Sequence, residues 1–91
     1  MKPIEECTTL QELYENPSHW TKGSGDNKTC FCLMYGCDKI YKDRLSVWMK
    51  VEKSIKDYIE KLTKQRGIVP WNDAPKRTIE DIRKLVKELN I

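Results

Sequence analysis

The sequence predicts an all-α fold, a compact single-domain bundle of about four helices with two ordered loops. Apolar side chains recur every three or four residues in four separate segments, which is the spacing of one face of an α-helix. Capping residues precede these segments, and proline or glycine follows several of them. A chain of 91 residues is long enough for one small core and too short for two, so residues 1–91 are expected to form one domain.

The composition is that of a folded, polar and mildly basic chain. Hydrophobic residues make up 38% and charged residues 34% of the sequence, and the formal net charge is +3. A dedicated nucleic-acid-binding domain usually has a larger, clustered excess of positive charge. No apolar run reaches the roughly 18 residues that a membrane helix needs, and the first residues lack the apolar core of a signal peptide. We therefore expect a cytoplasmic protein without a membrane partner.

A short first helix is expected over residues 8–15. Thr8 or Thr9 caps it, and an apolar face begins at Leu10. Pro17 ends this helix because the residue before a proline avoids the helical conformation.

The first ordered loop follows, over residues 15–29, and is rich in turn-forming residues. Trp20 either packs on the end of the core and pins the loop or anchors a binding surface. His19 is the only histidine of the chain. No catalytic spacing surrounds it, so we expect an exposed or capping histidine.

A second helix is expected over residues 28–41, capped by Asp26 or Asn27. Its core face should bury, among others, Leu33, Met34 and Cys37. Gly36 in mid-helix costs about 1 kcal/mol relative to alanine, which indicates that another helix or the tryptophan loop approaches the backbone there.

The four cysteines favour buried free thiols over a metal site. Without an export signal they are expected in a reducing compartment, where disulfides are rare. On a helix Cys30 and Cys32 lie about 200° apart, and the paired C-x2-C spacing of structural zinc sites is absent. Unoxidised cysteine usually behaves as a small buried hydrophobe, so Cys30, Cys32 and Cys37 are expected to be shielded, with a metal site or a reactive thiol as alternatives. We predict no metal and no cofactor.

The longest helix is expected over residues 46–65, ending near Gly67, which suits the left-handed C-terminal position. Charges of both signs cover its outer faces, which favours a solvated surface over a phosphate-binding stripe. Its apolar stripe consists of Val47, Trp48, Val51, Ile55, Tyr58, Ile59 and Leu62.

The second ordered loop, residues 68–75, is expected to be an extended connector because it contains two prolines. Trp71 is either buried beneath this connector or part of a contact surface. A last helix is expected over residues 78–90, where Thr78 and Asp81 form a capping-box-like start.

Three sequence blocks resemble a family of short bacterial and phage proteins of unknown function. The blocks are residues 20–23 (Trp-Thr-Lys-Gly), 32–37 (Cys-Leu-Met-Tyr-Gly-Cys) and 71–82 (Trp-Asn-Asp-Ala-Pro-Lys-Arg-Thr-Ile-Glu-Asp-Ile). The resemblance implies no known reaction. It implies a phage or prophage accessory protein, a class in which binding and inhibiting a host component is a common role.

We therefore predict a non-enzymatic protein that binds and modulates or inhibits a host or phage protein, such as a component of antiviral defence. A small rigid body with aromatic side chains on its loops can obstruct a partner's working surface without chemistry of its own. The predicted partner-binding residues are Trp20, Lys22, Trp71, Asp73 and Arg77.

Two alternatives remain open at this point. In the first, a small anionic ligand such as a nucleotide binds between the two loops, where Lys22 and Arg77 meet it. In the second, the lysines of the long helix group with Lys39, Lys42 and Arg44 to bind nucleic acid.

Overall fold

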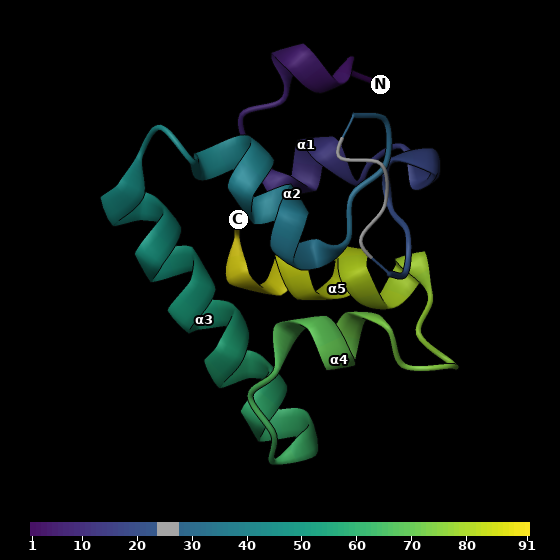
Figure 1. Cartoon of the computed structure of the whole chain (residues 1–91), viewed down its shortest axis with the longest axis vertical. Coiled ribbons are helices and arrows are strands. Elements are labelled where there is room, and N and C mark those ends of the chain that lie inside the picture. Colours follow the sequence, from purple (N-terminus) through teal and green to yellow (C-terminus); the bar gives the residue numbers. More distant parts are fainter. Residues whose placement is uncertain (24–27) are drawn as a thin grey trace.

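The computed structural model describes residues 1–23 and 28–91, and this part of the chain is all-α, as predicted (Figure 1). It contains five α-helices instead of about four, and an isolated parallel bridge between Trp20 and Phe31 is its only β pairing. The helices are α1 (Leu10–Leu13), α2 (Leu33–Tyr41), α3 (Leu45–Thr63), α4 (Ile68–Asn72) and α5 (Ile79–Leu89), with 3-10 turns at Ile4–Glu6 and Pro17–His19.

The additional helix is α4, which lies in the segment predicted to be an extended connector. Its third residue is Pro70, within the first turn, where a backbone N–H would have no acceptor in the helix. The backbone of Trp71 donates to Gly67 and that of Asp73 donates to Val69, at 3.2 and 3.0 Å. The prediction was wrong because a proline in the first turn is compatible with a helix.

Helix α2 begins at Leu33, later than predicted, because the preceding backbone pairs with the first loop. The N–H of Phe31 donates to the carbonyl of His19 at 2.8 Å, and its carbonyl accepts from the N–H of Thr21 at 3.3 Å. Cys32 is the N-cap residue. The caps predicted at residues 26 and 27 lie outside the described residues.

Tyr14 joins α1 to the start of α2. The single proton of its buried hydroxyl is shared between the carbonyl oxygens of Phe31 and Cys32, which lie 3.2 and 2.9 Å from the hydroxyl oxygen. A Cβ atom on Gly36 would collide with this hydroxyl, which confirms the predicted close approach at that glycine. The absence of a side chain at Gly36 therefore allows α1 and α2 to pack tightly.

The helices share one hydrophobic core (Figure 1). In this view α5 crosses the middle of the molecule between α1 and α4, while α3 runs along one side. Of the predicted core face of α2, Leu33 and Cys37 are buried and Met34 is half-buried. Buried side chains come from every helix and include Leu10, Leu13, Leu33, Ile55, Ile59, Ile68, Ile82 and Leu85.

Only the middle of α3 is buried. Val51, Ile55 and Ile59 lie in the core, whereas Val47 and Leu62, predicted to belong to the same stripe, are exposed. In Figure 1, the last turns of α3 extend below α4, and its first turn stands apart from α2 at the side of the molecule. The left-handed residue at its C-terminus is Lys64 (φ 63°), so the prediction that Gly67 takes this role was wrong.

The last residue of the sequence is also held by hydrogen bonds. The backbone oxygen of Ile91 accepts from the N–H of Leu10 and from the hydroxyl of Tyr41, both at 2.6 Å. This oxygen thereby links the end of α5 to α1 and α2.

In the described part of the chain, no helix is both long and apolar enough to cross a membrane.

Candidate functional site

The two loops predicted to bind a partner meet on Asn72, the buried last residue of α4. Its Oδ1 accepts from Trp20 Nε1 at 2.7 Å and from the N–H of Leu33 at 3.0 Å. Its Nδ2 donates to the carbonyl of Thr21 at 3.1 Å and to Asp73 Oδ1 at 2.9 Å. All four hydrogen-bonding positions of the amide are therefore used, and its orientation is fixed by its partners. We call Trp20, Thr21, Leu33, Asn72 and Asp73 the Asn72 network.

Two further contacts tie the first loop to the chain after α4. Asp73 Oδ1 also accepts from the N–H of Gly23 at 2.8 Å, and Gly23 has a left-handed φ of 72°, which glycine adopts without strain. Lys22 Nζ donates to the carbonyl of Pro75 at 2.8 Å. The charged groups of Lys22 and Asp73, both predicted to contact a partner, thus bind the two loops to each other.

Trp71 is buried, with 6% of its surface exposed, so the structure favours the first of its two alternatives. The guanidinium of Arg77 covers the indole at 4.0 Å from the ring centroid, and its Nε donates to the carbonyl of Trp71 at 2.8 Å. Trp20 is half-buried and packs on the same core. The two tryptophans therefore support this region from inside, and Trp71 is not an exposed anchor.

Arg77 and Lys22, predicted to meet an anion, have different surroundings. Arg77 lines a hollow of about 240 Å³ between the end of α3 and α4, whose walls include Gln65 and Pro70 but not Lys22. Its Nη1 lies 3.6 Å from a carboxylate oxygen of Asp81. This geometry gives no support to a shared anion site between the loops.

His19 has the predicted capping role, although it is buried and not exposed. Its Nδ1 lies 2.7 Å from the carbonyl oxygen of Leu13, the last residue of α1. A carbonyl only accepts, so Nδ1 carries the proton and Nε2 accepts from Asn16 Nδ2 at 3.4 Å. The hydroxyl of Ser18 donates to Asn16 Oδ1 instead of the imidazole. No serine–histidine nucleophile is assembled here.

Cys7, Cys32 and Cys37 are buried free thiols, and Cys30 is half-buried. Burial raises the pKa of the Cys37 thiol to about 12, so this group stays protonated at neutral pH. Among the described residues, no group of three or more histidine, cysteine, aspartate or glutamate side chains is arranged to hold a metal ion.

Two of the four lysines within α3 form ion pairs with acids of the same helix. Lys53 pairs with Asp57 and Lys56 with Glu52, both at 2.8 Å and both one helical turn apart. Arg66 also pairs with Asp57, at 2.8 Å. Such exposed pairs contribute little stability, but they neutralise part of the positive charge that a nucleic-acid-binding stripe would require.

An apolar hollow remains exposed beside the Asn72 network. It has a volume of about 190 Å³, and its rim carries Tyr35 of α2 and Val69 of α4, which are 39% and 43% exposed. The other lining residues are Gly23, Cys32, Met34 and Asp73. We call this hollow and its rim the junction surface, because the first loop, α2 and α4 meet there.

Sequence reasoning did not find the junction surface or the role of Asn72. The three sequence blocks each contribute to the Asn72 network, through Trp20, Leu33 and Asn72. Their common function in the structure is to hold separate segments together. Tyr35 and Val69 carried no signal in the sequence, because a single apolar residue on a helix is ordinary.

Comparisons of this chain with protein-family models, with curated proteins and with solved structures give no match. The resemblance to short bacterial and phage proteins therefore stays a prediction, and the functional argument depends on the geometry of this chain.

Proposed function

We propose that this chain is a non-enzymatic protein-binding module that acts by stoichiometric binding through its junction surface. The observation that carries this proposal is the apolar hollow with Tyr35 and Val69 on its rim. Protein interfaces concentrate their binding energy in a few well-packed side chains, and tyrosine is frequent among them. A partner would place an apolar side chain in the hollow and pack against the exposed phenol.

The Asn72 network makes this surface suitable for binding because it fixes the walls of the hollow. The hydrogen bond from Gly23 to Asp73 joins two of its lining residues directly. Asn72 holds the start of α2 through the N–H of Leu33, between the lining residues Cys32 and Met34. A surface that is ordered before binding loses less conformational entropy when the complex forms.

The partner that we propose is a host protein of the bacterium, with a component of antiviral defence as the first candidate. The support is the resemblance of the three sequence blocks to short phage and bacterial proteins. Covering a working surface of the partner would modulate or inhibit it without any reaction by this chain. In this proposal Trp20, Lys22, Trp71, Asp73 and Arg77 support the surface, and Tyr35 and Val69 form its main contacts.

The test compares affinity capture from a bacterial lysate by the original chain and by a Tyr35→Asp, Val69→Asp double variant. Proteins bound through the junction surface should be retained at least about tenfold less by the variant, because interface anchors contribute about 2 kcal/mol or more. Leu62→Asp is the matched control, since Leu62 is also exposed, at 61%, and does not line the hollow.

Circular dichroism melts must first show that both variants remain folded. Retention of the same proteins by the double variant and the original chain would contradict the proposal. A captured protein is then purified and titrated by calorimetry, where a stoichiometry of one partner per chain is expected.

A further inference from the structure

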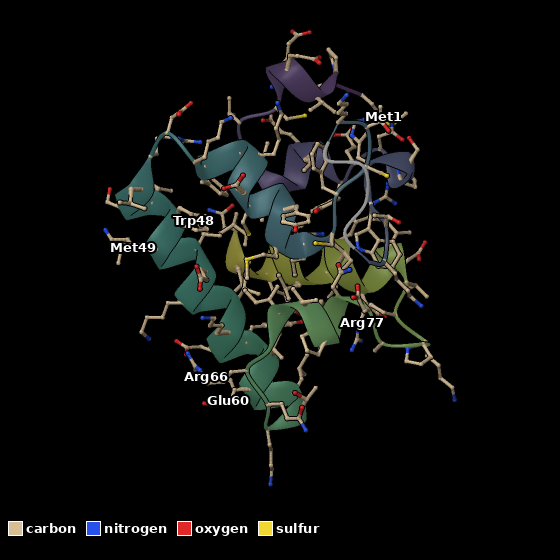
Figure 2. The ribbon with its side chains drawn as sticks, in the orientation of Figure 1. Met1, Trp48, Met49, Glu60, Arg66 and Arg77 are labelled. Carbon is tan, nitrogen blue, oxygen red and sulfur yellow. The ribbon has the colours of Figure 1, made fainter. Side chains whose placement is uncertain are left out.

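The beginning of α3 exposes a second apolar surface, away from the junction hollow. Leu45 and Met49 are 60% and 62% exposed and lie one turn apart on the same face of the helix. In Figure 2, Met49 points away from the other helices, on the outer side of α3. Neither residue lines the junction hollow.

Three cations flank these two residues in the sequence. Lys42 and Arg44 precede Leu45, and Lys50 follows Met49. Within the described residues, no carboxylate lies at ion-pair distance from any of these three cations. Asp43 is the only acid of this stretch, and the first turn of α3 contains none.

Arg44 illustrates how this charge is held. Its Nη2 donates to the carbonyl oxygens of Thr8 and Ile40, at 3.2 and 3.3 Å, and the guanidinium lies 5.1 Å from the centroid of the Tyr41 ring. These contacts fix the side chain without neutralising it. The middle turns of α3 differ, because Lys53 and Lys56 pair there with acids of the same helix.

We propose that this end of α3 docks a segment of a partner protein that presents apolar side chains next to acidic ones. The docking surface, here called the α3 patch, consists of Lys42, Arg44, Leu45, Met49 and Lys50. Leu45 and Met49 would lose their contact with water, and acidic side chains of the partner would compensate the three cations.

The chemistry of the α3 patch favours this occupant over two others. A second copy of the chain would bring its own Lys42, Arg44 and Lys50 close to the same cations, which is unfavourable. An anionic membrane requires a wider apolar face. On α3 this face continues with the charged side chains of Lys53 and Lys56.

The experiment titrates the full chain with a fluorescent synthetic peptide of about 16 residues, with leucines at helical spacing and glutamates between them. Binding is followed by anisotropy at low and high salt, and amide chemical-shift changes show the surface used. We expect the shifts to concentrate on residues 42–50 and the affinity to fall as salt rises, because exposed charges are screened. Met49→Glu should weaken binding about tenfold or more.

Leu62→Glu is the matched control, because it introduces the same charge at an equally exposed position of α3 and should leave the affinity unchanged. Equal binding of a peptide with lysine in place of glutamate, or shifts outside the α3 patch, would overturn the proposal. So would Leu45-dependent dimerisation in sedimentation, or Leu45-dependent binding to phosphatidylglycerol vesicles. The Tyr35→Asp, Val69→Asp chain should bind the peptide normally, so this test does not depend on the junction surface.

Discussion

Trp20 in the Asn72 network and Trp48 near the beginning of α3 differ in whether their indole N–H groups have a hydrogen-bond acceptor. The indole N–H of Trp20 donates to Asn72, whereas the indole N–H of Trp48 is buried without an acceptor in the described structure. The amide of Asn72 is completely buried and has every hydrogen bond satisfied. Next to Trp48, by contrast, Met49 is mostly exposed.

This difference separates the part of the molecule that specifies the fold from a part that stays available for contact. A buried polar network with all partners present fixes one arrangement of its segments, because any other arrangement leaves polar groups without partners. The beginning of α3 has no such restraint and no side-chain N-cap. The effects of substitutions on stability should therefore differ between the two regions in size and in sign.

The largest effect is expected for Asn72→Ala. This change leaves Trp20 Nε1 and the N–H of Leu33 without their acceptor, and each unsatisfied buried group costs about 1–3 kcal/mol. We expect the free energy of unfolding in urea to fall by about 3 kcal/mol, a large share of the stability of a small domain. Asn16→Ala, which removes an amide that caps a 3-10 turn, should cost only about 1 kcal/mol. Equal losses of unfolding free energy for Asn72→Ala and Asn16→Ala would show that the Asn72 network contributes no more stability than a single cap.

The next effect is expected at Gly36, where α1 meets α2. Glycine to alanine normally stabilises a helix interior by about 1 kcal/mol. Here the new methyl group would collide with the Tyr14 hydroxyl, so Gly36→Ala should destabilise the fold by about 2 kcal/mol in chemical denaturation. Adding Tyr14→Phe removes the colliding oxygen and should recover part of the loss. A stabilised single variant would show that the helices can separate here without cost.

A pair of matched substitutions tests the tryptophans directly. Trp20→Phe should lower the free energy of unfolding by about 1 kcal/mol, because it removes the hydrogen bond to Asn72. Trp48→Phe should leave the melting temperature unchanged or raise it, because the lost N–H has no acceptor. Similar melting temperatures for both variants would contradict the contrast between the two regions.

The smallest effect concerns pH and lies outside both regions. A hydrogen bond from Lys2, followed by those from the N–H and hydroxyl of Thr8, lowers the pKa of Glu12 from about 4.5 to about 2. The folded pKa is below the unfolded one, so this stabilisation is present above about pH 4.5 and is lost as the pH falls towards 2. Glu12→Gln should flatten the pH dependence of the melting temperature in this window, whereas Glu80→Gln should preserve it.

Much of the helical architecture could be predicted because it depends on neighbouring residues. Thr9 accepts from the N–H of Glu12 and caps α1, and Thr78 and Asp81 form the predicted capping box of α5. The donor and acceptor of each of these hydrogen bonds are three residues apart, so their spacing in the sequence predicts them. The approach to Gly36 was also predicted, although the sequence did not identify Tyr14 as the approaching side chain.

The candidate site was only partly predictable. The five residues predicted to bind a partner do lie around one region, because Trp20, Lys22 and Asp73 are tied to the segment at the end of α4. Of the two alternatives for Trp71, the structure favours burial, because the indole lies under Arg77. The exposed rim residues carried no sequence signal, because exposure depends on which neighbours cover a side chain.

By itself, the sequence determined the all-α class, the buried middle of the apolar face of α3 and the capped start of α5, because periodicity and capping act over one or two turns. The tertiary structure alone decided that Phe31 pairs with the first loop and that Asn72 joins three segments. Asn72 is 52 residues from Trp20 and 39 from Leu33 along the chain. Partners so far apart in the sequence meet only after the helices pack. Local sequence patterns therefore do not identify which distant polar group will form a hydrogen bond with Asn72.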